Sequence, residues 1–228
     1  MLSAASLGLA PAVMRAQGAA SDSSTESTAR GARTARVVAS VGAIAIAAAL
    51  DRPMRTALRD RGHDGATLRA LSNTGNALGT ASHLVPAMAG VYAITLLSGS
   101  HDAADRVIAI AAGYAAADLT AGVLKEGVGR ERPFVHGDPA RFHPFTSHDD
   151  HSFPSGHVTH IVALATGAAL ESNRAWVRDV GIGASALVGW QRIHADQHWT
   201  SDVVAAAVLS NMVSGAATRA VEHALLHR

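Results

Sequence analysis

The stretch SFPSGH at residues 152–157 opens an apolar run from Val158 to Leu170. Ser155 is a favoured helix N-cap, because its hydroxyl can accept a hydrogen bond from an unpaired backbone N–H group. Gly156 lets another group approach the backbone closely, and the positive end of a helix dipole favours an anion there. The stretch therefore predicts a helix start that can bind an anion, with His157 beside it. A proline followed by Ser-Gly-His also occurs in ordinary loops, so the prediction depends on partners elsewhere in the chain.

The composition favours closely packed helices. The chain has 228 residues, of which 48% are hydrophobic, 4% aromatic and 16% charged. The charged share lies below the roughly 25% that is usual in soluble domains. The formal net charge of +1 indicates no basic surface for nucleic acid. Cysteine is absent, which excludes disulfides, thiolate metal sites and a cysteine nucleophile.

The N-terminal part of the chain differs from the rest. Residues 1–20 are mostly small and apolar and predict a signal peptide, although the basic start typical of such peptides is missing. Residues 21–36 (SDSSTESTARGARTAR) are polar without apolar periodicity and predict a linker. Residues 37–228 would then form the helical domain. This division predicts export to the cell envelope, on the periplasmic side; a mis-set start codon and a disordered tail are the alternatives.

Apolar segments with helical character fill the remainder, and none alternates with period two. We predict an all-α fold, a compact bundle of about six core helices. The predicted helices are Val37–Leu50, His83–Leu97, Arg106–Lys125, Ser155–Leu170, Trp176–Trp190 and Ser201–Ala224. The charged region Asp51–Leu71 predicts a short amphipathic helix broken at Gly62 or Gly65.

Hydropathy leaves membrane insertion open. A spanning helix needs about 20 mostly apolar residues, and the uninterrupted runs here are shorter, with Asp118 inside the third predicted helix. The arginines of residues 30–36 would place the start of the first helix in the cytoplasm. The arginines between residues 52 and 69 would then face outward, against the same rule. A soluble bundle and a membrane-associated bundle both fit.

Two other groups of residues could complete an anion site. Lys125 and Arg132 follow the third predicted helix, which Gly127, Gly129 and Pro133 should end. Taken alone, these cations match the common case of a helix C-terminus whose Lys and Arg suit its dipole.

The second group leads into the last predicted helix and consists of Arg192, His198 and Asp202. The His and Asp lie about one turn apart, so the carboxylate can accept a hydrogen bond from one ring nitrogen. The other nitrogen then stays available as a base, nucleophile or ligand. Taken alone, this is a histidine and an aspartate near an N-cap at Thr200 or Ser201.

An up-and-down arrangement of the helices brings all three groups to one end of the bundle. Together they offer three cations, two histidines, one carboxylate and the backbone donors of Ser155–His157. Such a site suits a tetrahedral oxyanion, because Arg gives forked contacts and Lys a point charge.

The three groups resemble the signature motifs of the type 2 phosphatidic acid phosphatase superfamily. These motifs are Lys125-x6-Arg132-Pro133, Pro154-Ser155-Gly156-His157 and Arg192-x5-His198-x3-Asp202. The superfamily includes bacterial nonspecific acid phosphatases, lipid phosphatases and vanadium haloperoxidases, and the resemblance covers roughly residues 106–217. Gln191 departs from the serine that usually precedes the third-motif arginine, which should affect substrate preference more than reaction class.

The resemblance implies a phosphatase that hydrolyses phosphate monoesters of a lipid or a small molecule, without metal or cofactor. His198, oriented by Asp202, would form a phosphohistidine, and His157 would protonate the departing alcohol. The implied phosphate-binding residues are Lys125, Arg132, Ser155, Gly156 and Arg192. The alternatives are a vanadate-dependent haloperoxidase and a non-catalytic membrane or envelope protein. Lipid phosphates, undecaprenyl diphosphate and soluble phosphomonoesters all fit as substrates, and the sequence does not indicate an oligomeric state.

Three further polar groups lie near these motifs. The His-rich loop 134–153 is interpreted as a solvated loop, with a gate or a metal site as the alternative. His194 and Asp196 are predicted to contact substrate. Asp118 is predicted to pair with a cation near Lys125, seven residues further along the same helix.

Overall fold

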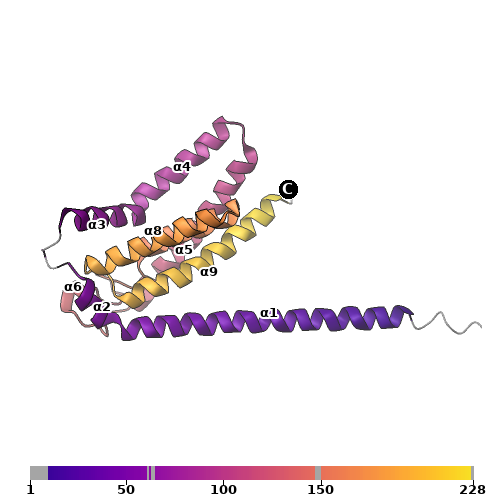
Figure 1. Cartoon of the computed structure of the whole chain (residues 1–228), viewed down its shortest axis with the longest axis horizontal. Coiled ribbons are helices and arrows are strands. Elements are labelled where there is room, and N and C mark those ends of the chain that lie inside the picture. The colour runs from indigo at the N-terminus through magenta and orange to yellow at the C-terminus, as the bar shows by residue number, and fades with distance from the viewer. Residues whose placement is uncertain (1–9, 61, 63–64, 147–149, 227–228) are drawn as a thin grey trace, which may run out of the picture. The chain divides into compact units, whose positions relative to one another are not determined.

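The computed structural model describes residues 10–60, 62, 65–146 and 150–226 (Figure 1). Its helices are α1 (Ala10–Ala49), α2 (Asp51–Leu58), α3 (Ala66–Gly79), α4 (Ala81–Leu97), α5 (His101–Val128), α6 (Pro133–His136), α7 (Gly156–Ser172), α8 (Ala175–His194) and α9 (Thr200–Leu226). Within these ranges the only β pairing is two isolated bridges, Arg130 with Phe142 and Glu131 with His151. The predicted all-α class is confirmed.

The chain divides into two compact units, residues 1–43 and 44–228. Helix α1 runs through residues 21–36, so the segment expected to be an irregular linker is helical. Several of its residues, notably alanine and arginine, have high helix propensity, which an argument from apolar periodicity does not register. Residues 1–9 of the expected signal peptide lie outside the described residues, and the division into signal peptide, linker and domain stays a prediction.

Four helices form the centre of the second unit. Helix α5 lies against α7 and α9, and α7 also contacts α8 and α9 (Figure 1). Val158 of α7, Val188 of α8 and Ala206 of α9 are buried in one core cluster. The helices approach closely where side chains are small: a Cβ atom on Gly113 would lie 2.3 Å from Oγ1 of Thr218. The up-and-down arrangement that the motifs needed is therefore present.

The region predicted to hold one short helix, residues 51–71, contains α2 and the first part of α3. Helix α3 continues to Gly79 and meets α4 at a bend of 59°. It packs against α7 and α8, and this contact requires glycine: a Cβ atom on Gly79 would lie 2.7 Å from Cβ of His157. Helix α3 is thus fixed against the start of α7, where the candidate site begins.

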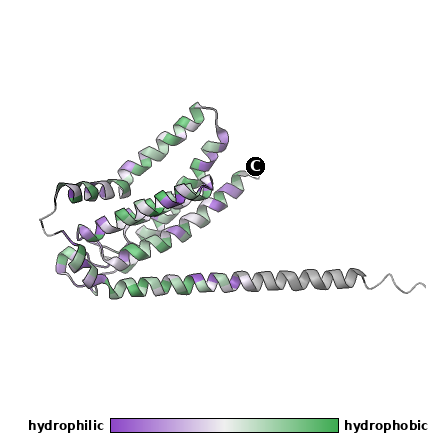
Figure 2. Ribbon diagram, in the orientation of Figure 1, coloured by the Kyte–Doolittle hydropathy of each residue, from purple (hydrophilic) through white to green (hydrophobic). Residues whose placement is uncertain are grey.

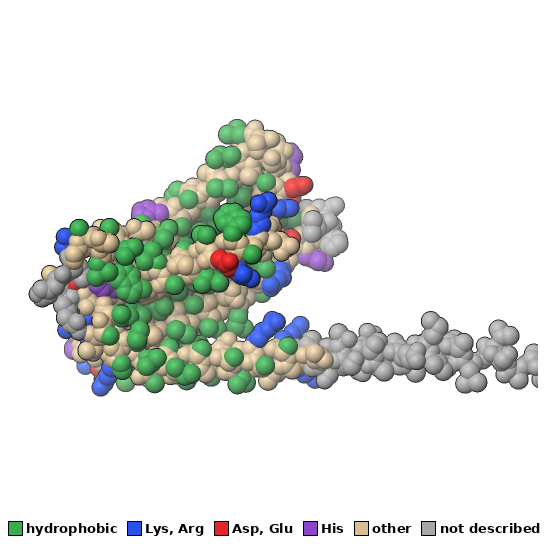
Figure 3. Space-filling view, viewed as in Figure 1, with side chains coloured by type: hydrophobic (Ala, Val, Ile, Leu, Met, Phe, Trp, Pro, Cys, Tyr) green, Lys and Arg blue, Asp and Glu red, His purple; other side chains and the backbone are tan. Residues whose placement is uncertain are grey.

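Within the described residues, three helical segments are long and apolar enough to cross a membrane: Arg30–Ala49, His101–Val128 and Thr200–Leu225. The bent pair α3–α4 is a fourth if it counts as one span. Only 28% of the α5 window and 33% of the α9 window are buried inside the protein. Large apolar side chains lie exposed, with Leu97 at 89% and Leu119 at 71%. Apolar residues follow these helices in Figure 2, and Figure 3 shows hydrophobic side chains across the middle of the visible face.

Candidate active site

The turn before α7 presents donors that the helix itself does not use. Ser155 is the N-cap residue, as predicted, but the expected capping bond from its hydroxyl is not made. That hydroxyl is buried and has no hydrogen-bond partner among the described residues. Gly156 and His157, as first-turn residues, have backbone N–H groups without an intrahelical acceptor. No other heavy atom lies within 4 Å of where a Cβ on Gly156 would be, so an anion can reach this turn.

Lys125, in the last turn of α5, points at the same turn. Its Nζ donates to the carbonyl oxygens of His151 at 3.2 Å and Pro154 at 3.1 Å. The backbone N–H of Ser155 donates to the carbonyl of Asp202 at 3.3 Å. These contacts join the end of α5, the start of α7 and the start of α9, as the motif spacing predicts.

The two motif arginines are held by side-chain amides. Arg132 Nη1 donates to Gln197 Oε1. Arg192 donates from Nε to Gln191 Oε1 at 2.5 Å and from Nη2 to Asn76 Oδ1 at 2.6 Å. Gln191, the departure from the family pattern, therefore fixes the orientation of Arg192. Asn76 comes from α3, which the sequence analysis did not connect with the site.

His198 lies between α8 and α9 and is 4% exposed. Its Nδ1 is 3.7 Å from Oδ2 of Asp202, which is longer than a hydrogen bond. That oxygen instead accepts the backbone N–H of Trp199 at 2.9 Å. Burial lowers the pKa of His198 to about 4, although Asp202 acts in the opposite direction. The ring is therefore neutral around pH 7, the state that a nucleophile requires.

His157 faces α3 across the site. Its Nε2 lies 3.4 Å from Oγ1 of Thr80, whose hydroxyl donates to the carbonyl of Asn76 at 2.7 Å. Burial, followed by the charge of Arg192, lowers the pKa of His157 to about 3. A phosphate dianion bound between these cations would act in the opposite direction and raise that pKa. Asn76 lies in the last turn of α3, and Thr80 is the residue between α3 and α4.

A buried ion group behind Asp202 was also missed. Arg130 Nη1 donates to Oδ1 of Asp202, and Arg130 Nη2 donates to Oδ2 of Asp51, both at 2.7 Å. Asp51 opens α2 and is 1% exposed, and Asp202 is fully buried. Only the position of Arg130, inside the first motif, could have drawn attention to it.

Three predictions on neighbouring residues have a different outcome. His194 Nδ1 lies 2.7 Å from the carbonyl oxygen of Leu58. The carboxylate of Asp196 accepts hydrogen bonds from Nε and Nη2 of Arg55 at 2.6 and 2.7 Å. Both bind α2 and its end, so the prediction that they contact substrate has no support in this geometry.

Asp118 accepts from Nε2 of His160 at 2.8 Å, so the predicted pairing with a cation near Lys125 is wrong. Seven residues of helix separate the two side chains by about 10 Å along the axis. Nδ1 of His160 lies 3.0 Å from the carbonyl of Gly79.

Two described histidines of the His-rich loop lie against other protein groups, whereas His143 is exposed. His136 Nδ1 is 2.9 Å from Glu131 Oε1, and His151 is 3% exposed. His148 and Asp149 lie outside the described residues. Among the residues that are described, no group of three or more His, Asp and Glu side chains could hold a metal ion.

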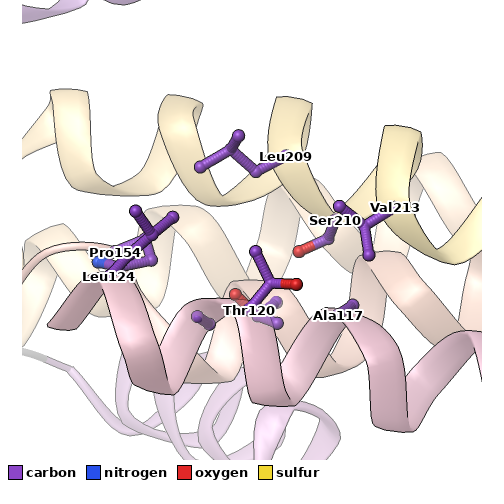
Figure 4. Close-up of a pocket in the computed structure, with 9 residues that line it drawn as sticks. Ala117, Thr120, Leu124, Pro154, Leu209, Ser210 and Val213 are labelled. Atoms are coloured by element: carbon purple, nitrogen blue, oxygen red, sulfur yellow. The ribbon is translucent and has the colours of Figure 1, made fainter.

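A small cavity adjoins the α7 turn between α5, α7 and α9 (Figure 4). Pro154, Thr120, Leu124 and Ser210 are among its lining residues, and its volume is about 10 Å³. This is space for roughly one water molecule, so the cavity is not the place of a substrate.

Comparison with known proteins places this site in a family context. A family model described as the PAP2 superfamily matches residues 106–225, the part of the chain that contains all three motifs. An undecaprenyl-diphosphatase of Sulfolobus acidocaldarius is 34% identical over 65 residues, which are 28% of this chain and 31% of that protein.

The fold is similar to the crystal structure of the first transmembrane PAP2 type phosphatidylglycerolphosphate phosphatase from Bacillus subtilis. The TM-score is 0.61 at 19% identity, and the match covers 82% of this chain and 96% of that one. The likeness therefore extends beyond the motif region to most of the helices.

Proposed function

The chain belongs to the PAP2 superfamily, and from that membership we propose that it is a phosphatase that hydrolyses phosphate esters through a phosphohistidine on His198. The observation that carries the proposal is how the site holds its cations. Lys125 donates to two backbone carbonyls and Arg192 to two side-chain amides. Neutral acceptors fix these groups without neutralising them, so their charge is available to a phosphate.

The residues support a two-step reaction. His198, neutral and buried, attacks phosphorus while His157 donates a proton to the departing oxygen. Lys125, Arg132, Arg192 and the donors of Ser155 and Gly156 hold the non-bridging oxygens as charge develops on them. His157 then accepts a proton from the water that attacks the phosphohistidine. The positive charges in this scheme are side chains, so it uses no metal ion.

The experiment that tests the proposal is trapping of the intermediate. The purified protein, incubated with ³²P-labelled substrate and quenched in alkali, should carry acid-labile label, and the His198→Ala variant should carry none. Activity should persist in excess chelator and fall with vanadate. Activity that disappears in chelator and returns with a divalent cation would contradict the scheme.

Vanadate bound in the same cradle would give the haloperoxidase alternative a cofactor. The motif cations that suit phosphate suit vanadate equally. Protein incubated with vanadate, peroxide and bromide should leave a bromination-sensitive dye unchanged; bromination would favour that alternative.

A lipid phosphate is the substrate class that we propose. The two relatives described above are named for an undecaprenyl diphosphate and for phosphatidylglycerol phosphate, and the apolar surfaces of α4, α5 and α9 suit a bilayer. The assay compares these two lipids with glycerol phosphate at equal concentration in detergent micelles. A clear preference for the soluble ester would contradict the lipid assignment. Release of the protein by alkaline carbonate would contradict membrane insertion.

The proposed location of the site is the periplasmic side of the inner membrane. Arg30, Arg33 and Arg36 precede the apolar part of α1, which favours a cytoplasmic start, and Asp51 follows that helix into the site. The chain has no cysteine, so single cysteines can report the side. In intact cells a membrane-impermeant maleimide should label Ala140→Cys, at the site end, and spare Ser98→Cys, between α4 and α5. The reverse pattern would contradict the orientation.

A further inference from the structure

Helix α2 precedes the family match but holds both ends of the segment that carries His198. At one end, His194 Nδ1 contacts the carbonyl of Leu58 and Asp196 is paired with Arg55. At the other end, Asp51 Oδ1 accepts the backbone N–H of Ser201 at 2.8 Å, and Oδ2 accepts its hydroxyl at 2.8 Å. Asp51 therefore acts as a cap for α9 from a distant part of the chain, where a carboxylate also suits the helix dipole.

The same carboxylate meets the ion group behind His198. Arg130 lies between Asp51 and Asp202, with 2.7 Å contacts to each, and Nη1 also donates to the hydroxyl of Ser201 at 2.7 Å. Trp199 packs near its guanidinium, with 5.5 Å from Cζ to the ring centroid. Two carboxylates thus share one guanidinium in a place shielded from water.

The net charge of Asp51, Arg130 and Asp202 determines how well a positive charge on the His198 ring is stabilised. If Arg130 faced Asp202 alone, the pair would be neutral, and Asp202 would offer little negative charge to an imidazole that becomes cationic. With Asp51 on the other side of the guanidinium, the three groups together carry one negative charge. A negative charge beside the ring stabilises the charge that develops on it as it attacks phosphorus.

We propose that Asp51 is a positioning residue of the active site, which compensates the charge of Arg130 so that Asp202 can stabilise the charge developing on His198. This rests on the proposed function, since it concerns the attacking histidine. Asp51 touches no substrate; it acts through Arg130 and Ser201. Neither Asp51 nor α2 lies in the region that the family model matches.

The test measures the first turnover. The rate constant of the nitrophenolate burst from nitrophenyl phosphate, at saturating substrate, is compared in wild type, Asp51→Asn, Arg130→Gln and the double variant. Asp51→Asn removes one negative charge with little change of shape. We expect the burst to slow by roughly 10- to 100-fold, the range found for outer-shell partners of metal-binding histidines. The matched control is Asp138→Asn. This aspartate pairs with Arg52, the neighbour of Asp51 in α2, but the pair lies at the surface. The burst rate constant of this variant should stay within about twofold of the wild-type value.

The double variant separates charge from structure. Removing both Asp51 and Arg130 charges restores one net negative charge beside His198, so its burst should be faster than that of Asp51→Asn. If the charges served only to hold the fold, the double variant would be the slowest of the set, and the proposal would be wrong.

Two measurements keep the outcome decisive. Vanadate affinity reports whether the phosphate cradle is folded in each variant; Asp51→Asn should retain it while its burst slows. A variant that loses vanadate binding and burst together shows a structural role and overturns the proposal, as does a burst equal to that of Asp138→Asn. A wild-type protein that forms no acid-labile phosphoenzyme refutes the proposed function itself, and a normal wild-type phosphoenzyme confines the failure to Asp51.

Discussion

His157 is assigned to protonate the departing oxygen, so the effect of removing it should depend on the leaving group. His157→Ala eliminates this proton donor and the later base, but leaves the nucleophile in place. An alkyl alkoxide such as that of glycerol needs a proton as it departs, whereas nitrophenolate is stable as an anion. The variant should therefore discriminate between two esters that the wild type handles by the same steps.

The magnitude follows from the position of His157. Its ring is beside Thr80, and burial together with the charge of Arg192 lowers its pKa to about 3. A bound phosphate dianion raises that pKa, so the ring can carry the proton it donates when substrate is present. General acid catalysis contributes about 100- to 10,000-fold, which equals roughly 2.7–5.4 kcal/mol of transition-state stabilisation. We expect a loss in this range for alkyl phosphates and a loss below about tenfold for nitrophenyl phosphate.

The assay reads phosphoenzyme formation, because hydrolysis of the intermediate also needs His157. Rapid-quench labelling follows the alkyl ester, and the nitrophenolate burst follows the aryl ester. His198→Ala should abolish both reactions, and His101→Ala, an exposed histidine at the far end of α5, should change neither. Equal losses for the two esters in His157→Ala would refute the reasoning, and His157 would then be a phosphate ligand or a structural residue.

Three other predictions follow from the site. Asn76→Asp places a carboxylate against Arg192 and should weaken vanadate binding at least about fivefold. Asn73→Asp, at an exposed position of the same helix, should leave the vanadate affinity unchanged. Equal vanadate affinities in the two variants would contradict the role of neutral partners. Gly79→Ala directs a Cβ to 2.7 Å from His157 and 2.9 Å from Val188, which should lower the free energy of unfolding by about 1–3 kcal/mol and reduce turnover. In Gly90→Ala the new Cβ meets nothing beyond its own stretch of helix within 4 Å, so thermal melts should show this control to be neutral or stabilised. The pKa of His198 is lowered to about 4 in the folded protein, against about 6.5 in the unfolded chain. Because the unfolded chain binds the proton first, the melting temperature should fall as the pH is lowered from 6.5 to 4. It should fall less in His198→Asn.

The helices of the bundle could be predicted because their signal is local. Residues 158–170 and 201–224 carry long apolar runs, and the three motifs have fixed spacings, so an up-and-down order was enough to bring them together. Helix α3 gave no such signal, since its sequence ATLRALSNTGNALG is rich in residues of low helix propensity. Its glycines are there for contact: Gly75 and Gly79 bring it within van der Waals distance of Gln191 and His157. Tertiary packing, which one sequence does not display, makes this segment helical and brings it to the site.

The arginines show most clearly what the sequence could not resolve. Arg55, Arg130 and Arg192 are equivalent in a count of charges, but the structure gives them different partners. Arg55 pairs with Asp196 in the turn between α8 and α9. Arg130 pairs with Asp51 of α2 and Asp202 of α9. These carboxylates compensate the charge of the two arginines. Arg192 faces Asn76 and Gln191, whose amide oxygens orient the guanidinium and leave its charge uncompensated.

This difference explains why the family motifs contain only some of the cations near the site. An anion binds where a fixed positive charge has no anionic partner, and among the described residues no carboxylate forms an ion pair with Lys125 or Arg192. Arg130 lies inside the first motif segment and yet serves the opposite purpose, since Asp51 and Asp202 surround it. Each of the two arginines also has a partner outside the motifs, which is Asp51 of α2 for Arg130 and Asn76 of α3 for Arg192. Helices α2 and α3 therefore take part in setting which of the motif-region charges have a carboxylate partner and which have a neutral one.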